Sequence, residues 1–218
     1  LAALPVLLRA HAAATERAQF RSPITVEDVM ASKPIAPPLK LLDCCPVSDG
    51  AAAVLISAEA PGRGPALEIT AAAQAHTHQH LGEAPEDVAL GARISSAAAL
   101  EEAGRGVGDL GRLGIYDSFS VTLSMLLEAT GVCAPGRAPF DAAARRFGRD
   151  GPLPLNTHGG LMSYGHPGVA GGLSHLVETV RRMREDDVAG ARRRPVALLH
   201  GDGGVLSANV SAVLEAAA

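Results

Sequence analysis

The order of strand-like and helix-like segments beyond residue 65 constrains the fold more than any other feature of the chain. Residues 66–77 have the character of a strand, and residues 84–104 have acids in the first turn and Gly104 at the end, as helices favour. Three further segments predict a short strand running into a helix, a second helix and a hairpin of two strands: residues 113–131, 169–185 and 194–215. This order predicts an α/β fold in which helices flank a mixed sheet.

The first part of the chain predicts a covering segment and one more strand. Residues 1–20 have the periodicity of an amphipathic helix, a short helix begins at Thr25, and prolines follow. Residues 51–57 form an apolar run with the length and purity of a buried strand. The run "PGRGP" at residues 61–65 concentrates prolines and glycines, and it predicts a domain junction.

Composition excludes several classes of protein. Hydrophobic residues make up 47% of the 218 residues, which is ample for a core, but no apolar stretch approaches the roughly 20 residues of a membrane span. The N-terminus lacks the basic start of a signal peptide, so we predict a cytoplasmic protein without membrane contact. The net charge of -4 and the absence of a basic stripe make nucleic acid an unexpected partner.

Three loops carry unusual polar residues: "YDSF" (116–119), "SYGHP" (163–167) and "HGDGG" (200–204). Sites in open sheets form where loops leave the strand ends, so these loops are candidates to converge. A Tyr and a His in Gly-rich turns can supply an acid, a base and donors toward an oxyanion. Each motif alone also fits a bland reading: a structural Gly-His-Pro turn, a core tyrosine, or an Asp-Gly hairpin turn.

No metal or disulfide site is predicted. Three cysteines, with two adjacent and no CxxC spacing, suggest neither a disulfide framework nor a zinc site. The run "HTHQH" at residues 76–80 invites a metal interpretation, but alternate histidines also fit one face of a strand, and no acid or cysteine lies near enough in sequence to complete a site.

From "LLDCCPVSDGAAAVL" onward the sequence resembles the C-terminal half of the thiolase superfamily, especially the sterol-carrier-protein and lipid-transfer-protein types. Four motifs stand in the family's order: "CPVSDGAAAVL", "YDSF", "NTHGGLMSYGHPGVAGG" and "LLHGDGGVLS". The resemblance implies a thiolase-like mixed five-stranded sheet covered by helices. It also implies a division into residues 1–40 as the end of a covering segment, 41–62 as the last strand region of the N-terminal half, and 63–218 as the C-terminal thiolase domain.

The resemblance assigns His166 as the donor to the thioester oxygen, whereas the family's cysteines are missing. The second catalytic cysteine of the family would stand at Ser118 or His200, and a serine hydroxyl is no base at neutral pH. The nucleophilic cysteine of ordinary thiolases comes from their N-terminal half. The three cysteines of this chain match no catalytic position, and we interpret them as small buried hydrophobic residues: Cys44, Cys45 and Cys133.

The motifs lack the cysteines but carry two tyrosines: Tyr116 stands where the family has an Asn or His, and Tyr164 stands at the usually apolar position before Gly-His. This pattern resembles the steroid side-chain aldolases. These enzymes cleave a 3-hydroxyacyl-CoA by a retro-aldol reaction. By this resemblance Tyr116 and Tyr164 exchange the protons, provided that a neighbour such as His166 lowers the pKa of a phenol. Main-chain N–H groups of Gly203 and Gly204 would join His166 in binding the enolate oxygen.

Other polar residues of these loops are given supporting roles. His158 lies one turn earlier in the same loop and is a candidate to contact and position the catalytic side chains. Ser118 and His200 are candidates for the same role or for binding the oxyanion. Asp117 is interpreted as a structural acid at a helix N-terminus. The predicted catalytic residues are therefore Tyr116, Tyr164 and His166.

Two rival functions stay open. One is an acetyl-CoA acyltransferase whose nucleophilic cysteine lies in an N-terminal segment, and the other is a non-catalytic thiolase-like subunit that binds lipid or CoA. For every alternative we expect a CoA thioester as the substrate or ligand and no permanently bound cofactor. The resemblance further implies a homodimer and, for the aldolase type, a small partner protein with an OB-fold and a zinc ribbon.

Overall fold

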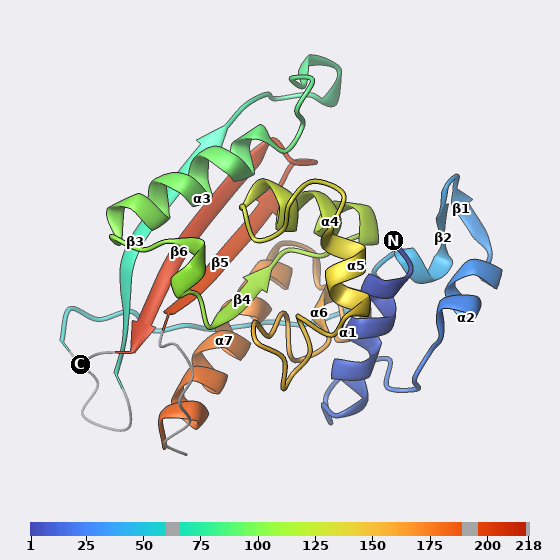
Figure 1. Ribbon diagram of the computed structural model, residues 1–218, viewed down its shortest axis with the longest axis horizontal. Helices are drawn as coiled ribbons and strands as arrows, with labels where there is room; N and C mark the ends of the chain where they lie inside the picture. Colours follow the sequence, from blue (N-terminus) through green and yellow to red (C-terminus); the bar gives the residue numbers. More distant parts are fainter. Residues whose placement is uncertain (60–65, 189–195, 217–218) are drawn as a thin grey trace.

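The computed structural model describes residues 1–59, 66–188 and 196–216. Its main sheet has the strand order β3, β6, β5, β4 (Figure 1). The four strands are β3 (Leu67–His76), β4 (Arg112–Ile115), β5 (Val196–Gly203) and β6 (Ala208–Ala216). β4 runs parallel to β5, whereas β6 is antiparallel to both β5 and β3, so the sheet is mixed, as predicted.

The main sheet has four strands within the described residues, so the prediction of five was wrong. Residues 51–57, predicted as a buried strand, have no regular secondary structure, and Leu55 is 94% exposed. A strand needs a neighbour to satisfy its main-chain N–H and C=O groups. No strand in the described residues pairs with this segment, so its apolar composition alone does not make it a strand.

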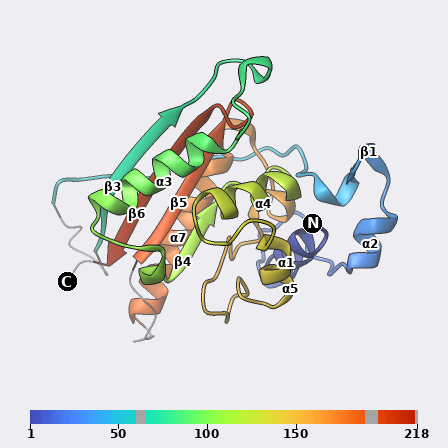
Figure 2. The ribbon, with the colours of Figure 1, turned by 45° about the horizontal axis from the view of Figure 1, so that its top comes forward.

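Helices cover both faces of the sheet. They are α1 (Ala3–Ala13), α2 (Val26–Ala31), α3 (Leu90–Glu102), α4 (Ser120–Ala129), α5 (Ala138–Ala143), α6 (Gly160–Ser163) and α7 (Gly171–Val188), with 3-10 turns at Leu41–Asp43, Leu81–Glu83, Val107–Asp109 and Gly168–Ala170. α3 packs on β3 and β6, and α7 packs on β4 and β5 from the other side (Figures 1 and 2). Successive side chains of β5 therefore point to opposite faces of the sheet. Leu198 belongs to the large core with α3, whereas Leu199 packs with Met183 of α7.

The ends of the predicted helices follow capping chemistry. The helix predicted from about Pro85 begins at Leu90, and in the turn ahead of it the Asp87 carboxylate accepts the Ala89 N–H at 3.2 Å. Gly104 and Gly131 follow α3 and α4 in the left-handed region, with φ of 63° and 77°. Thr25 caps α2 through a reciprocal pair of hydrogen bonds with Asp28.

The N-terminal helix packs on other helices rather than on the sheet. Helix α1 contacts α5 and α6, and its Leu4 and Leu8 are fully buried in the large core. A small hairpin of β1 (Pro34–Ala36) and β2 (Leu39–Lys40) lies beyond α2 (Figure 2). The domain junction predicted at residues 61–65 lies outside the described residues. No helix within 1–59, 66–188 and 196–216 is long and apolar enough to cross a bilayer.

Candidate active site

The hydroxyl of Tyr116 and Nε2 of His166 lie 2.9 Å apart. Tyr116 directly follows the last residue of β4, and His166 lies in the turn between α6 and α7. The two rings meet at right angles, with their centres 5.7 Å apart. Two of the three predicted catalytic residues are therefore brought together, although 50 positions separate them in the chain.

The loop that carries His166 is held by a segment far away in the sequence. Ser48 donates its main-chain N–H to the His166 carbonyl, and its Oγ accepts the His166 N–H, each at 3.1 Å. Gly165 has a φ of +140°, which only glycine adopts readily, and a Cβ there would lie 3.0 Å from Ser48 Oγ. Gly165 thus allows the two segments to approach closely, and the two hydrogen bonds with Ser48 fix the position of the His166 main chain.

The hydrogen bonds of His166 define its tautomer. Nδ1 lies 3.1 Å from the Gly168 N–H, which is a donor, so Nδ1 is an acceptor. Burial lowers the pKa of His166, so the ring is neutral at pH 7 and carries its single proton on Nε2. His166 therefore donates its Nε2–H to the Tyr116 oxygen, and the Tyr116 hydroxyl proton is left to donate elsewhere.

The pKa of Tyr116 is raised rather than lowered. Burial and then the negative charge of Asp202 raise it to about 12, with smaller contributions from Cys45 and Asp117. The expectation that a neighbour lowers the pKa of this phenol was therefore wrong for Tyr116. The pKa stays high because the neutral His166 offers a hydrogen bond but no positive charge. At neutral pH Tyr116 is a proton donor.

Tyr164 occupies a different environment from Tyr116. Its ring packs on the ring of His158, with the centres 4.9 Å apart, and its main-chain N–H closes α6 by donating to Gly160. His158 is fully enclosed, and burial holds its pKa well below the usual value. His158 Nε2 lies 3.4 Å from Ser174 Oγ. The neutral His158 ring therefore packs against the Tyr164 ring from the protein interior.

Asp117 and Asn156 join the end of β4 to the loop that carries both predicted rings. The buried Asp117 carboxylate accepts the N–H groups of Leu161 and Met162 and the Asn156 amide at 2.9, 3.3 and 3.1 Å. Asn156 also bonds the N–H and the carbonyl of Ile115. Asp117 is a structural acid at a helix N-terminus, as predicted, but the helix is α6 and not α4. Asn156 was not predicted, although an Asn ahead of a Gly-Gly pair is a familiar turn signal.

His200 lies inside the sheet. Its Nδ1 is 2.9 Å from Ser211 Oγ, and its carbonyl accepts the Tyr116 N–H. Burial lowers the pKa of His200 to about 4, so it is neutral and no general acid at pH 7. Its Nε2 is buried and has no hydrogen-bond partner among the described residues.

The turn after His200 contains an acid that sequence reasoning passed over. Asp202 is half-buried near the end of β5, and burial raises its pKa to about 6, with opposing contributions from the N–H groups of Leu206 and Gly203. The Gly203 N–H, predicted to bind an oxyanion, thus acts on the Asp202 carboxylate. Gly204 turns the chain with a φ of +60°. The signal for Asp202 was present in "HGDGG", where it was interpreted only as a hairpin turn.

The three cysteines are unsuited to nucleophilic catalysis. All three are free thiols, and only Cys133 is fully buried, whereas Cys44 and Cys45 are half-buried. Burial raises the pKa of Cys45 to about 11 and that of Cys133 to about 12. Since the thiolate is the nucleophile, both thiols are inert at neutral pH. Cys45 instead donates its main-chain N–H to the carbonyl of Ser118 at 2.9 Å, so Ser118 contacts this segment through its main chain.

The histidines of "HTHQH" gather no further metal ligands in the described part of the chain, where no group of three such side chains is found. His76 ends β3, and Nδ1 of His78 lies 2.9 Å from Thr77 Oγ1.

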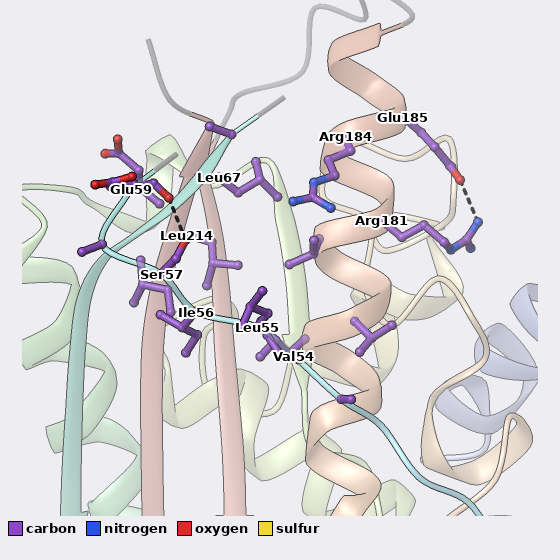
Figure 3. A pocket seen from close by; sticks show the side chains of 18 residues that line it. Val54, Leu55, Ile56, Ser57, Glu59, Leu67, Arg181, Arg184, Glu185 and Leu214 are labelled. Atoms are coloured by element: carbon purple, nitrogen blue, oxygen red, sulfur yellow. Dashed lines mark hydrogen bonds and ion pairs between the residues drawn. The ribbon is translucent and has the colours of Figure 1, made fainter. Parts of the chain in front are cut away.

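A groove of about 1180 Å³ lies apart from this cluster. Figure 3 shows the apolar side chains of residues 54–56 facing β3, β6 and α7 across it, with Arg181 and Arg184 on α7. Arg181 pairs with Glu185 at 2.7 Å. None of the lining residues belongs to the Tyr116–His166 cluster, so this groove is separate from the candidate site at the strand ends.

Known proteins share this fold and these sequence patterns. A solved structure described as "Ltp2-ChsH2(DUF35) aldolase" matches with a TM-score of 0.79 and 25% identity, covering 99% of this chain and 57% of that chain. The acetyl-CoA acetyltransferase of Methanothermobacter thermautotrophicus is 33% identical over 94% of this chain and 55% of its own length. The 17-hydroxy-3-oxo-4-pregnene-20-carboxyl-CoA lyase of Mycobacterium tuberculosis is 33% identical over 85% of this chain and 50% of its own length.

The chain thus spans about half the length of the curated relatives it matches. The family model described as "Thiolase C-terminal domain-like" matches residues 73–216, which include Tyr116, Tyr164, His166 and Asp202. The resemblance that the four motifs carry is confirmed, and the mixed sheet between α3 and α7 has the expected thiolase-like architecture. The chain belongs to the thiolase C-terminal domain-like family.

Proposed function

We propose that this chain is the C-terminal half of a thiolase-fold enzyme that cleaves a 3-hydroxyacyl-CoA by a retro-aldol reaction. The observation that carries the proposal is the hydrogen bond between Tyr116 and the Nε2–H of a neutral His166. An acyl-transferring thiolase needs an ionised cysteine, whereas burial raises the pKa of Cys45, the thiol that acts electrostatically on Tyr116, to about 11. The described site therefore holds groups suited to moving protons.

The retro-aldol step makes three demands. A base removes the proton of the β-hydroxyl, the Cα–Cβ bond breaks to give a ketone, and its electron pair moves onto the thioester as an enolate. A donor then protonates Cα to give the shorter acyl-CoA. Tyr116 supplies that proton, because its phenol stays protonated and His166 stabilises the phenolate that remains.

Tyr164 supplies the second phenol of the proposed site. Its loop is tied to that of His166 through Gly165, and the buried His158 fixes its ring. We assign it the hydrogen bond that orients the substrate hydroxyl. A sterol-derived acyl group is the favoured substrate, since a relative 33% identical over 85% of the chain is named as a lyase of a pregnene carboxyl-CoA.

A second candidate function is acyl transfer. An acetyl-CoA acetyltransferase is 33% identical over 94% of this chain, and its function would require a nucleophilic cysteine from outside residues 1–218. A third candidate is a non-catalytic subunit that binds a CoA thioester. We further propose a homodimer and a small partner protein, since the matching aldolase structure is described with a second component, ChsH2.

The proposal is tested by identifying products. The complete protein, with and without a candidate partner, is incubated with a steroid 3-hydroxyacyl-CoA branched at the carbinol carbon. Mass spectrometry should find a ketone and a shorter acyl-CoA with the unsubstituted protein. It should find neither with Tyr116→Phe, and less of both with Tyr164→Phe. Acetyl transfer to CoA without ketone formation would support the transferase, and no reaction of either kind would support the binding subunit.

A further inference from the structure

We propose that Asp202 is the general base that takes the β-hydroxyl proton in the retro-aldol step. This assignment rests on the proposed lyase function and adds a residue to its site. Asp202 meets three requirements for a base beside Tyr116: a place at the same edge of the sheet, an oxygen free to accept a proton, and an affinity for protons matched to neutral pH.

The strand register brings Asp202 to the edge where Tyr116 lies. β4 and β5 are parallel and Ile115 pairs with His200, so the carboxyl ends of both strands meet at one edge. Tyr116 is the first residue beyond β4, and Asp202 is two residues beyond His200, on the same face of the sheet as His200. The two groups are close enough for the charge of Asp202 to raise the pKa of Tyr116.

One carboxylate oxygen of Asp202 has no partner. Its Oδ1 is buried and accepts no hydrogen bond from the described residues, and no described cation pairs with the carboxylate. A buried acceptor that is left without a hydrogen-bond donor destabilises the fold. An acid whose only task was to stabilise the hairpin turn would need only the N–H groups of Leu206 and Gly203 as partners. This oxygen keeps the acceptor capacity that a base for the substrate hydroxyl needs.

The surroundings of Asp202 and Tyr116 give these two groups different protonation states at pH 7. Burial raises the pKa of Asp202 to about 6, so the carboxylate is ionised at pH 7 yet more basic than an exposed one. The titratable groups beside it are Tyr116 and His200, both neutral at that pH. The helix over this face, α3, presents Gly91 to Asn209 and Ser95 to Ser211, and neither carries a charge.

The proton balance closes within the site. Asp202 takes the hydroxyl proton as the carbinol becomes a ketone and the Cα–Cβ bond breaks. Tyr116 protonates Cα of the enolate and remains as a phenolate that accepts the His166 Nε2–H. Transfer of one proton from the Asp202 carboxylic acid to Tyr116, directly or through a water molecule, restores both groups, so no oxidant or further reactant is needed.

Asp202→Asn in the complete protein tests the assignment, because the amide keeps the size of the side chain but cannot take the proton. With a 3-hydroxyacyl-CoA as the probe, kcat should fall by roughly 100-fold to 10,000-fold, with a small change in KM. The acidic limb of the kcat/KM profile, near pH 6 in the unsubstituted protein, should disappear. Asp202→Ala with added formate should recover part of kcat. Glu101→Gln, which removes an exposed acid from α3, is the matched control and should change nothing.

The outcomes separate the two proposals. Cleavage by the unsubstituted protein with loss of kcat and of the acidic limb in Asp202→Asn supports both. Cleavage that Asp202→Asn leaves within a few-fold, with the same limb, overturns the role of Asp202 and leaves the lyase standing. If the unsubstituted protein cleaves no 3-hydroxyacyl-CoA, the lyase proposal fails and the role of Asp202 fails with it. A circular-dichroism melting curve shared by all variants excludes misfolding as the cause.

Discussion

Nε2 of His166 donates a hydrogen bond to the hydroxyl oxygen of Tyr116 across 2.9 Å. The direction of this bond follows from the Gly168 N–H, which occupies Nδ1 and leaves the ring proton on Nε2. The imidazole therefore acts as a donor, and the phenol keeps its own proton to donate to another group. This relationship gives the pair an acidic function at neutral pH.

Replacing His166 with Gln should preserve a donor to Tyr116, whereas His166→Ala should remove it. We expect kcat for 3-hydroxyacyl-CoA cleavage to fall by roughly 100-fold or more in His166→Ala, as when an oxyanion donor is removed, and by a smaller factor in His166→Gln. Steady-state kinetics measure both. Equal activity in the alanine variant and the unsubstituted protein would exclude the donor role.

Cys45→Ala should retain kcat within a few-fold, although Cys45 lies beside Tyr116. A thiol with a pKa of about 11 supplies almost no thiolate at pH 7. Iodoacetamide should accordingly modify Cys45 far more slowly than a free cysteine. An acyl adduct on Cys45, found by peptide mass spectrometry after incubation with substrate, would contradict this prediction.

Asp117→Ala should destabilise the protein by about 2 to 4 kcal/mol, because it leaves the N–H groups of Leu161 and Met162 and the Asn156 amide without their acceptor. The loop that carries His166 should also loosen, so kcat should fall. Asp117→Asn keeps one acceptor oxygen and should recover part of both. Urea unfolding followed by circular dichroism gives the free energies of unfolding. An alanine variant as stable as the unsubstituted protein would show that these hydrogen bonds to Asp117 do not hold the loop.

Glu178→Gln should lower the free energy of unfolding by about 2 to 4 kcal/mol at pH 7. Burial alone would raise the pKa of Glu178, but hydrogen bonds from Arg182, Thr157 and Arg181 lower it to about 2. A lowered folded-state pKa means that the stabilisation is complete above the unfolded value near 4.5 and is lost as the pH falls toward about 2.

Glu185→Gln is the control for Glu178, because Glu185 contacts the same two arginines but its side chain is 48% exposed. An exposed pair contributes about 1 kcal/mol or less, so this variant should be nearly neutral. Thermal unfolding between pH 2 and 7 measures both variants. Similar losses in both would show that burial does not decide the strength of these pairs.

Leu55→Ser tests whether another part of the thiolase fold covers the groove of Figure 3. Leu55 is 94% exposed within this chain, so a covering surface in the complete protein would bury it. We propose such a surface and expect the substitution to cost about 1.5 to 3 kcal/mol there. Val169→Ser, at an exposed position outside the groove, should cost little. Equally small changes in both would show that Leu55 stays exposed.

The alternation of strands and helices could be predicted because periodicity and capping are local properties. Gly104 and Gly131 end their helices as the C-cap rule requires, and the hairpin of β5 and β6 turns at Gly204. Residues 51–57 could not be predicted correctly, because a strand depends on a partner that lies elsewhere in the fold. The apolar run indicated burial but gave no information on which surface provides it.

The site was predictable in its motifs and not in its electrostatics. The loops of Tyr116 and His166 carry family motifs, so their convergence followed from the resemblance. The pKa of Tyr116 depends on burial and on Asp202, neither of which a motif encodes. Tyr164 was grouped with Tyr116 because both are phenols, whereas its ring packs on His158. Asp202 was missed since Asp-Gly is also a common turn sequence.

The most direct test of the lyase proposal is cleavage in heavy water without free CoA. The complete protein is given a steroid 3-hydroxyacyl-CoA in deuterium oxide, and the products are analysed by mass spectrometry. The retro-aldol account predicts a ketone and a shorter acyl-CoA that carries one deuterium at Cα, since the enolate is protonated by an exchangeable phenol. Product formation that requires added CoA, with no ketone released, would contradict it.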